Sequence, residues 1–152
     1  MNYQQLQAFV ESRIPEAEIT EGKQFLEVII PPHKLKELAS ELNSNKETAF
    51  DFLYCLTGAD WDEYMMVIYH LRSTIYSHSI VLKAKIDDRE NPEVETVCDI
   101  WRTAEFHERE TYDFFGIVFK NHPDMRRIFL EDDWVGFPLR KDYVDEINII
   151  DY

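Results

Sequence analysis

The chain has 152 residues, of which 45% are hydrophobic, and its formal net charge is −14. A chain of this length is typical of one domain with a hydrophobic core. The acidic charge argues against binding of free nucleic acid or of anionic membranes, because both attract surfaces rich in Lys and Arg. No apolar run approaches the roughly 20 residues of a membrane span, and the N-terminus lacks the order of a signal peptide. We therefore expect a cytoplasmic protein.

The first third of the chain predicts a helix, a strand and a second helix. Residues 3–13 carry apolar side chains at helical spacing, and Pro15 ends that segment. The run FLEVIIPP, residues 25–32, is rich in β-branched residues and is stopped by two prolines. The segment HKLKELASEL, residues 33–42, then places its leucines on one side of a helix.

Three candidate strands follow, at residues 49–60, 63–72 and 75–87. The linker between the last two is too short for a parallel crossover, which needs about a dozen residues, so we expect an antiparallel meander. In the third strand, apolar side chains alternate from Ile80 to Ile86 with wetter ones. This alternation predicts a half-buried strand with one wetter face, so helices should cover one side of the sheet.

An acidic turn at residues 87–95 precedes a further helical pattern. Apolar side chains recur there at helical spacing: Val94, Val97, Cys98 and Trp101. The pattern resumes until Gly116, which we expect to cap the helix C-terminus. One bent helix or two short ones should result, with Cys98 on a buried helix face.

Beyond Gly116 the sequence shows no clean repeat of 3.6 or 2 over roughly 35 residues, which is unusual inside a compact domain unless the segment lies on a partner. The predicted fold is therefore α+β, with a mostly antiparallel sheet, helices packed on it and a long irregular C-terminal tail. We expect an α+β core domain at residues 1–118. Residues 119–152 should form the extended tail that docks on a partner subunit.

The cysteines and most of the histidines give no metal-binding pattern. Cys55 and Cys98 lie 43 positions apart, without CxxC or Cys/His spacing around either. This spacing predicts neither a zinc nor an iron–sulfur site. His33, His70 and His78 are expected at strand or helix ends, with no role as metal ligands.

A catalytic interpretation rests on His107 with Glu108 and Glu110, a possible base beside carboxylates. A zinc-protease motif HExxH would need a histidine where Thr111 stands. The sequence also lacks GxGxxG, GxxxxGK[ST] and GxSxG, the local signatures of nucleotide and nucleophile chemistry. A small free-standing enzyme using His107 is therefore the less favoured alternative.

Basic residues gather late in an otherwise acidic chain: Lys120, Arg126, Arg127, Arg140 and Lys141. One interpretation is internal pairing with the acidic residues nearby, Glu131, Asp132, Asp133 and Asp142. The other is that the arginines reach carboxylates of a partner, beside the anchors Trp134, Phe137 and Leu139. On the preceding helix, Arg109 has Glu105 and Asp113 four residues away on either side, which would allow a surface ion-pair ladder.

The segment ERETYDFFGIVFKNHPDMRRI, residues 108–128, resembles the signature of a known family: the 30-kilodalton peripheral-arm subunit of respiratory complex I, NADH:quinone oxidoreductase. The chain matches every fixed position of that signature, with Glu108, Arg109, Glu110, Asp113, Phe114, Phe115, His122, Arg126 and Ile128. A second family block, W-x-G-x-P-L-R-K-D, is matched by Trp134, Gly136, Pro138, Leu139, Arg140, Lys141 and Asp142. The resemblance includes a TGADW-like segment at residues 57–61 and covers most of the chain. Two departures are Phe106, where the family often has Trp, and Val144, where it commonly has Pro.

The resemblance implies a non-catalytic peripheral-arm subunit that binds no flavin, iron–sulfur cluster, quinone or metal of its own. NADH, flavin, clusters and quinone would belong to the parent complex, a proton-pumping translocase at the cytoplasmic face of the plasma membrane. The implied partner is the 49-kilodalton quinone-site subunit, alongside other peripheral-arm subunits. The alternative within this class is the equivalent subunit of a membrane-bound hydrogenase or formate-hydrogenlyase-type complex.

The residues expected to position the domain and to form the subunit interface follow from the two matched blocks. The main candidates are Glu108, Arg109, Asp113, His122, Arg126, Arg127, Arg140 and Lys141. Gly116 and Pro123 lie among the signature positions and complete the predicted interface set. None of these residues is expected to make or break bonds.

Overall fold

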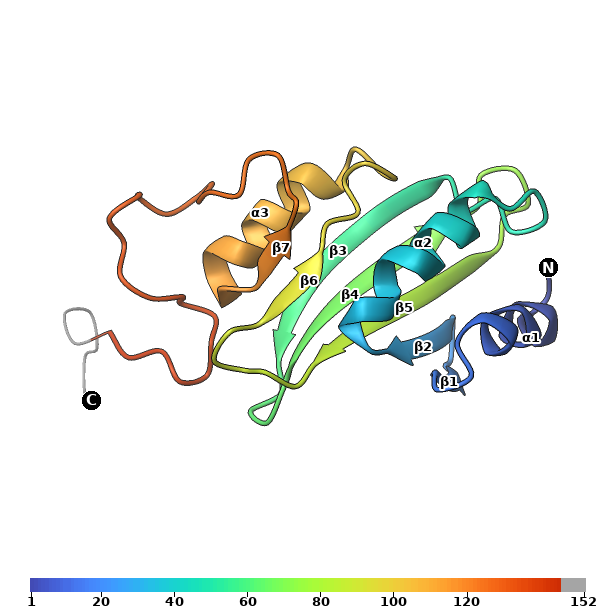
Figure 1. Ribbon diagram of the computed structural model, residues 1–152, viewed down its shortest axis with the longest axis horizontal. Helices are drawn as coiled ribbons and strands as arrows, with labels where there is room; N and C mark the ends of the chain where they lie inside the picture. The colour runs from blue at the N-terminus through green and yellow to red at the C-terminus, as the bar shows by residue number, and fades with distance from the viewer. Residues whose placement is uncertain (146–152) are drawn as a thin grey trace.

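A computed structural model describes residues 1–145 and shows a mixed five-stranded sheet (Figure 1). The strands run in the spatial order β1-β2-β5-β4-β3, and their bounds are β1 Glu18–Glu21, β2 Leu26–Ile30, β3 Phe52–Asp60, β4 Met65–Arg72 and β5 Ser79–Ile86. β2 pairs with β5 in parallel, and the remaining neighbours in this sheet are antiparallel. Two short strands, β6 (Glu93–Glu95) and β7 (Val118–Lys120), form a separate parallel pair. The predicted α+β fold and the antiparallel meander of β3, β4 and β5 are confirmed.

Three α-helices accompany the sheet: α1 (Tyr3–Arg13), α2 (Leu35–Ser44) and α3 (Ala104–Phe115), with a short 3₁₀ turn, η1 (Pro32–Lys34), before α2. The N-terminus of α1 is closed by a capping box, in which Asn2 Oδ1 accepts from Gln5 N at 2.9 Å and Gln5 Oε1 accepts from Asn2 N at 3.0 Å. Gly116 caps α3 in the left-handed conformation, with φ of 73°, as the sequence predicted.

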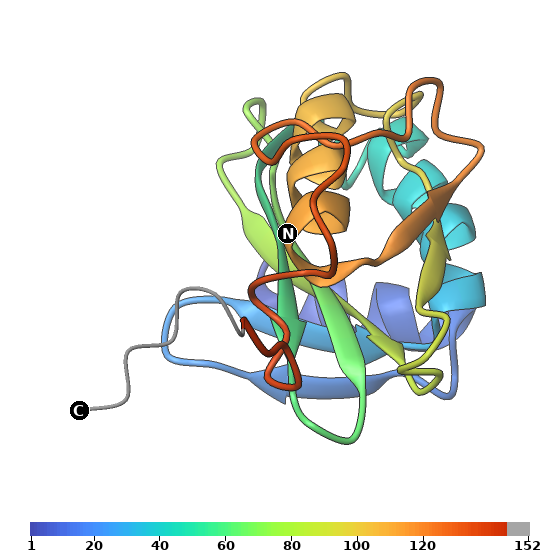
Figure 2. The same ribbon diagram turned by 90° about the vertical axis from the view of Figure 1, so that its left-hand side faces the viewer.

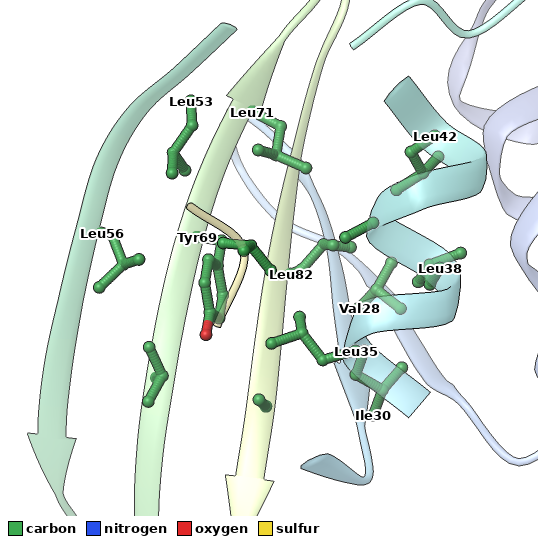
Figure 3. Close-up of a cluster of buried hydrophobic side chains, with 14 of the residues drawn as sticks. Val28, Ile30, Leu35, Leu38, Leu42, Leu53, Leu56, Tyr69, Leu71 and Leu82 are labelled. Carbon is green, nitrogen blue, oxygen red and sulfur yellow. The ribbon is translucent and has the colours of Figure 1, made fainter. Parts of the chain in front are cut away.

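The hydrophobic core lies between the sheet and the helices, because α2 and α3 both lie on the same side of the strands (Figures 1 and 2). Alternate side chains of the strands point toward α2, whose leucines pack between them (Figure 3). The labelled core residues include Val28, Leu56, Tyr69, Leu71 and Leu82 from the strands and Leu35, Leu38 and Leu42 from α2. The expectation of helices on one side of the sheet is thus confirmed.

The prediction of a helix beginning near Val94 is wrong. Val94 lies in β6, which pairs with β7, and the chain then turns before α3 begins at Ala104. Val97, Cys98 and Trp101 are buried as the spacing suggested, but Cys98 lies in a turn and not on a helix face. Four buried apolar side chains in eight residues fit a short strand followed by turns as well as a helix, so the spacing alone did not separate the two.

Other differences concern short or terminal elements. β1 and β7, both of at most four residues, were not predicted, and the third predicted strand began too early, because the chain turns before Ser79. After β7 the chain is irregular, and this segment crosses one end of the molecule next to α3 (Figure 1). The predicted tail reached residue 152, and residues 146–152 lie outside the described part. Within residues 1–145, no helix is long and apolar enough to cross a membrane.

Candidate functional site

The irregular segment after β7 is held on α3 by Arg127. One of its nitrogens, Nη1, donates to the carbonyl oxygen and to Oδ1 of Asp113, both at 2.9 Å. The other, Nη2, donates to the carbonyl oxygens of Trp134 at 3.0 Å and Gly136 at 2.8 Å. The guanidinium also lies over the ring of Phe137, 5.0 Å from its centroid. A single, largely buried side chain therefore links α3 to the later turn of the tail.

The other oxygen of Asp113 organises the backbone that follows Arg127. Oδ2 accepts from the N–H groups of Ile128 at 3.2 Å, Phe129 at 2.7 Å and Leu130 at 3.0 Å. Asp113 is fully buried, and burial by itself would raise its pKa, but these hydrogen bonds and Arg127 outweigh burial, so the pKa is lowered. We call Asp113 and Arg127 the α3 clasp.

Arg109 and His122 add a second set of bonds between α3 and the tail. Arg109 donates to the carbonyl oxygens of Arg126 at 3.2 Å and Arg127 at 2.9 Å. Its nearest carboxylate is that of Asp124, at 3.6 Å, so the predicted surface ladder along α3 gives way to contacts with the tail. His122 Nε2 donates to the carbonyl oxygen of Glu105 at 2.9 Å, and its Nδ1 accepts from Asp124 N at 3.0 Å.

The second matched block, residues 134–142, folds back onto the end of β3. Asp60, at the end of β3, accepts two hydrogen bonds from Arg89, one of them at 2.8 Å, and one from Lys141 N at 2.8 Å. Arg140 donates to the carbonyl oxygen of Arg89 at 3.0 Å and to Asp142 at 3.0 Å. The hydrogen bond from Arg89 is the main reason that the pKa of Asp60 lies well below its usual range. We call Asp60, Arg89, Arg140 and Lys141 the β3 clasp.

Two glycines allow this close packing. At Gly116 a Cβ atom would lie 2.6 Å from the ring of Phe137, so only glycine lets that ring cover the end of α3. At Gly58 a Cβ atom would lie 2.7 Å from the ring of Phe115 and 2.9 Å from Thr111 Cγ2. The TGADW-like segment thus supplies both the contact of β3 with α3 and the carboxylate of the β3 clasp.

Glu108 is a buried acid of the site whose pKa is raised. It is fully buried, Thr96 Oγ1 donates to its Oε2, and Val97 N donates to its Oε1 at 2.8 Å. Burial raises the pKa of its carboxyl to about 7, against the opposing effect of these hydrogen bonds. Glu108 therefore anchors the turn after β6 to α3.

The clasps leave several large apolar side chains on the surface. Phe129 is 64% exposed and stacks on Phe114 with centroids 5.7 Å apart, and Val135 is 86% exposed. Phe106, Leu139 and Val144 are also exposed. We call these side chains the apolar rim, and it is defined by Phe106, Phe129, Val135, Leu139 and Val144.

The predicted site residues therefore separate into those that contact the chain itself and those that are exposed at the surface. Most of the charged ones contact the chain itself, while their contact with a partner remains a prediction. Of the proposed anchors, Leu139 is exposed, whereas Trp134 and Phe137 are half-buried, with the Phe137 ring against the end of α3. Arg126 differs from Arg127, because its side chain is 67% exposed and pairs with Asp124 at the surface. The remaining signature positions, Glu110, Phe115, Pro123, Ile128 and Pro138, lie along α3 or the tail.

Three residues of the β3 clasp and of the contacts to Glu108 were not predicted: Asp60, Arg89 and Thr96. Asp60 lies inside the TGADW-like segment that carried part of the resemblance, so its signal was present. Arg89 and Thr96 lie outside both matched blocks, and only the folded chain brings them to the β3 clasp and to Glu108.

The catalytic alternative gains no support from this geometry. Glu108 points into the buried layer with Thr96 and Val97, while His107 Nδ1 is buried and has no hydrogen-bond partner among the described residues. The expected base therefore does not meet the carboxylate of Glu108. Consecutive residues on a helix point about 100° apart, which explains why they separate.

These features define an α+β domain whose irregular C-terminal segment is clasped to its own helix and sheet, with apolar side chains left exposed at that end. The chain belongs to the family described as respiratory-chain NADH dehydrogenase, 30 Kd subunit, which matches residues 28–147.

The similar proteins include both separate and fused subunits. A protein of Roseiflexus castenholzii, named as the C-type subunit of NADH-quinone oxidoreductase, is 38% identical over 140 residues, which are 89% of this chain and 80% of that protein. A protein of Phocaeicola vulgatus, named as a C/D-type subunit of the same enzyme, is 52% identical over 120 residues, or 78% of this chain. The match covers 23% of that protein, so the chain corresponds to about a quarter of the fused relative's length.

A solved structure also shares the fold. A chain from the membrane-bound sulfane sulfur reductase, an archaeal respiratory membrane complex, superposes with a TM-score of 0.78 at 25% identity. The superposition covers 95% of this chain and 86% of that one.

Proposed function

We propose that this chain is a non-catalytic peripheral-arm subunit of a proton-pumping NADH:quinone oxidoreductase, and that it docks on the quinone-site subunit and positions it for electron transfer. The family membership supports the assignment to complex I. The docking role is supported by the apolar rim, four of whose five side chains lie on the irregular segment after β7, because exposed large apolar side chains are common at protein interfaces.

The clasps explain how such a surface could be ready before the partner arrives. An irregular segment that is already fixed loses less conformational entropy on binding than a disordered one. Arg127 and Asp113 fix the segment that carries Phe129 and Val135, and the β3 clasp fixes the segment that carries Leu139. The signature charges would then act indirectly, by shaping the surface that the rim presents.

The identity of the partner is supported by the fused relatives. Proteins named as C/D-type subunits contain, by that name, the C-type and the D-type subunit in one chain. Fusion of two subunits is readily accommodated where they are neighbours in the assembly. The D-type subunit, which is the 49-kilodalton quinone-site subunit, is therefore the proposed partner, alongside other peripheral-arm subunits. NADH, flavin, iron–sulfur clusters and quinone would bind elsewhere in the complex, with this chain peripheral at its cytoplasmic face.

A second candidate of the same class is a related membrane-bound respiratory complex, such as a hydrogenase or formate-hydrogenlyase-type assembly. This second candidate is supported by the fold shared with a chain of the sulfane sulfur reductase. That respiratory membrane complex has a different activity from NADH:quinone oxidoreductase.

The rim can be tested by one charge at one exposed apolar position. We expect Val135→Glu to reduce the amount of the quinone-site subunit recovered with the tagged chain about tenfold or more, because a carboxylate would be desolvated in the interface. Ile75→Glu is the matched control, since Ile75 is 68% exposed in the turn between β4 and β5, at the end of the sheet away from the tail (Figure 1). Equal recovery with both variants would contradict docking through the rim.

A further inference from the structure

Three side chains with metal-binding atoms meet where α3, the turn after β6 and the turn after β7 come together. The ligand atoms of Cys98, Glu108 and His122 all lie within 4.8 Å of one another. These three side chains come from separate parts of the sequence, so the local spacing of Cys and His predicted no zinc site.

The donor set suits zinc. Thiolate, imidazole and carboxylate are the three side-chain ligand types that Zn²⁺ takes in proteins. His122 Nε2 and Glu108 Oε2 are 3.8 Å apart. Ligand atoms of a tetrahedral zinc site lie about 3.3–3.8 Å from one another, given bonds of about 2.0–2.3 Å. Small side-chain rotations would thus bring the sulfur of Cys98 into the same shell.

The local charge also favours a cation. Glu108 is fully buried, and among residues 1–145 its one ion-pair contact is with the His122 ring. His122 Nε2 donates to the carbonyl oxygen of Glu105, and Nδ1 accepts from Asp124 N. A bound cation would add a charged partner to this carboxyl, whose present neighbours are two hydrogen-bond donors, an imidazole and a thiol.

A route to these groups exists. A cavity of about 670 Å³ opens to solvent and is lined in part by Thr96, Cys98 and Glu105. Cys98 is therefore both a wall of the cavity and a neighbour of the two buried ligands. An ion entering from solvent would reach the thiol first, and the cavity could supply a water molecule as a fourth ligand.

We propose that Cys98, Glu108 and His122 form a zinc-binding site that ties the turn after β6 and the tail to α3. Binding replaces the thiol proton of Cys98, which leaves to solvent, and any proton held by Glu108. The His122 ring exchanges its hydrogen bond to Glu105 for the metal, and its proton moves to Nδ1 at the cost of the bond from Asp124 N. This site is independent of the docking role.

The test uses the purified full chain, prepared free of metal, with Co²⁺ as a spectroscopic probe and Zn²⁺ as the competitor. We expect one equivalent of Co²⁺ to give thiolate-to-cobalt charge-transfer absorption, which Zn²⁺ removes. Cys98→Ser should abolish this absorption and weaken Zn²⁺ binding about tenfold or more, the least that loss of a direct ligand should cost. Cys55→Ser is the matched control, because Cys55 is the other thiol and lies on β3, and it should leave both unchanged.

His122→Gln provides a second variant that keeps the thiol. It should retain the fold, since glutamine can still donate to Glu105, yet bind Zn²⁺ more weakly than the unaltered chain. Thermal unfolding with and without Zn²⁺ checks that each variant folds, and the unaltered chain should gain more stability from the ion than either ligand variant. Absence of charge-transfer absorption in the unaltered chain, or its persistence in Cys98→Ser, would overturn the proposal.

Discussion

Removal of the Arg127 side chain should release the tail from α3. Arg127→Ala removes four hydrogen bonds and leaves the fully buried carboxylate of Asp113 without its cation. Breaking a buried ion pair by deleting one partner costs about 3–5 kcal/mol. Three backbone N–H groups still reach Asp113, so we place the loss near the lower end, at about 3 kcal/mol.

Hydrogen exchange measures this loss where it occurs. The amides of Phe129 and Leu130 donate to Asp113, and a local loss of about 3 kcal/mol would speed their exchange about 100-fold. Arg126→Ala is the matched control, because that neighbouring side chain is 67% exposed and pairs at the surface with Asp124. Exchange at Phe129 that responds equally to both substitutions would refute the clasp.

Three further substitutions test separate parts of the structure. Gly116→Ala should destabilise the fold by about 1–3 kcal/mol in urea unfolding, because φ is 73° and the new Cβ would press on a ring; a loss below about 0.5 kcal/mol would contradict this. Tyr69→Phe should be neutral or stabilising by up to about 1 kcal/mol, since its buried hydroxyl has no hydrogen-bond partner among the described residues; a clear loss would reveal one. Asp60→Asn should be less stable than the unaltered chain at pH 6. The lowered pKa of Asp60 gives stability that is present above the unfolded value of about 3.9 and lost as the pH falls below it, so the two unfolding curves should converge toward pH 2, and a constant difference would argue against the β3 clasp.

The sequence predicted those parts of the fold that repeat over many residues. The helix at residues 3–13 and the strands from Phe52 to Ile86 follow periods of 3.6 and 2, and both patterns are long enough to be read reliably. β1 and β6 could not be found this way, because strands of three or four residues owe their pairing to neighbours outside the short segment itself.

For the candidate site, too, the sequence predicted important residues but not the contacts between residues that are distant in the chain. The signature includes Asp113 and Arg126, and Arg127 was predicted beside them, but the sequence could not show that Asp113 and Arg127 face each other across 14 positions and are buried. It also gave no reason to separate Arg127 from the exposed Arg126 beside it. Such differences depend on the path of an irregular segment, which has no periodicity to predict it.

The most direct test of the docking role is to recover the unaltered chain with its natural partners. The chain would carry an N-terminal tag in its native host, the membranes would be gently solubilised, and the proteins eluting with it would be identified by mass spectrometry. We expect recovery of the quinone-site subunit together with flavin- and cluster-bearing proteins. A nickel–iron large subunit in their place would assign the chain to the related complex, and a chain recovered alone from the soluble fraction would contradict the docking role.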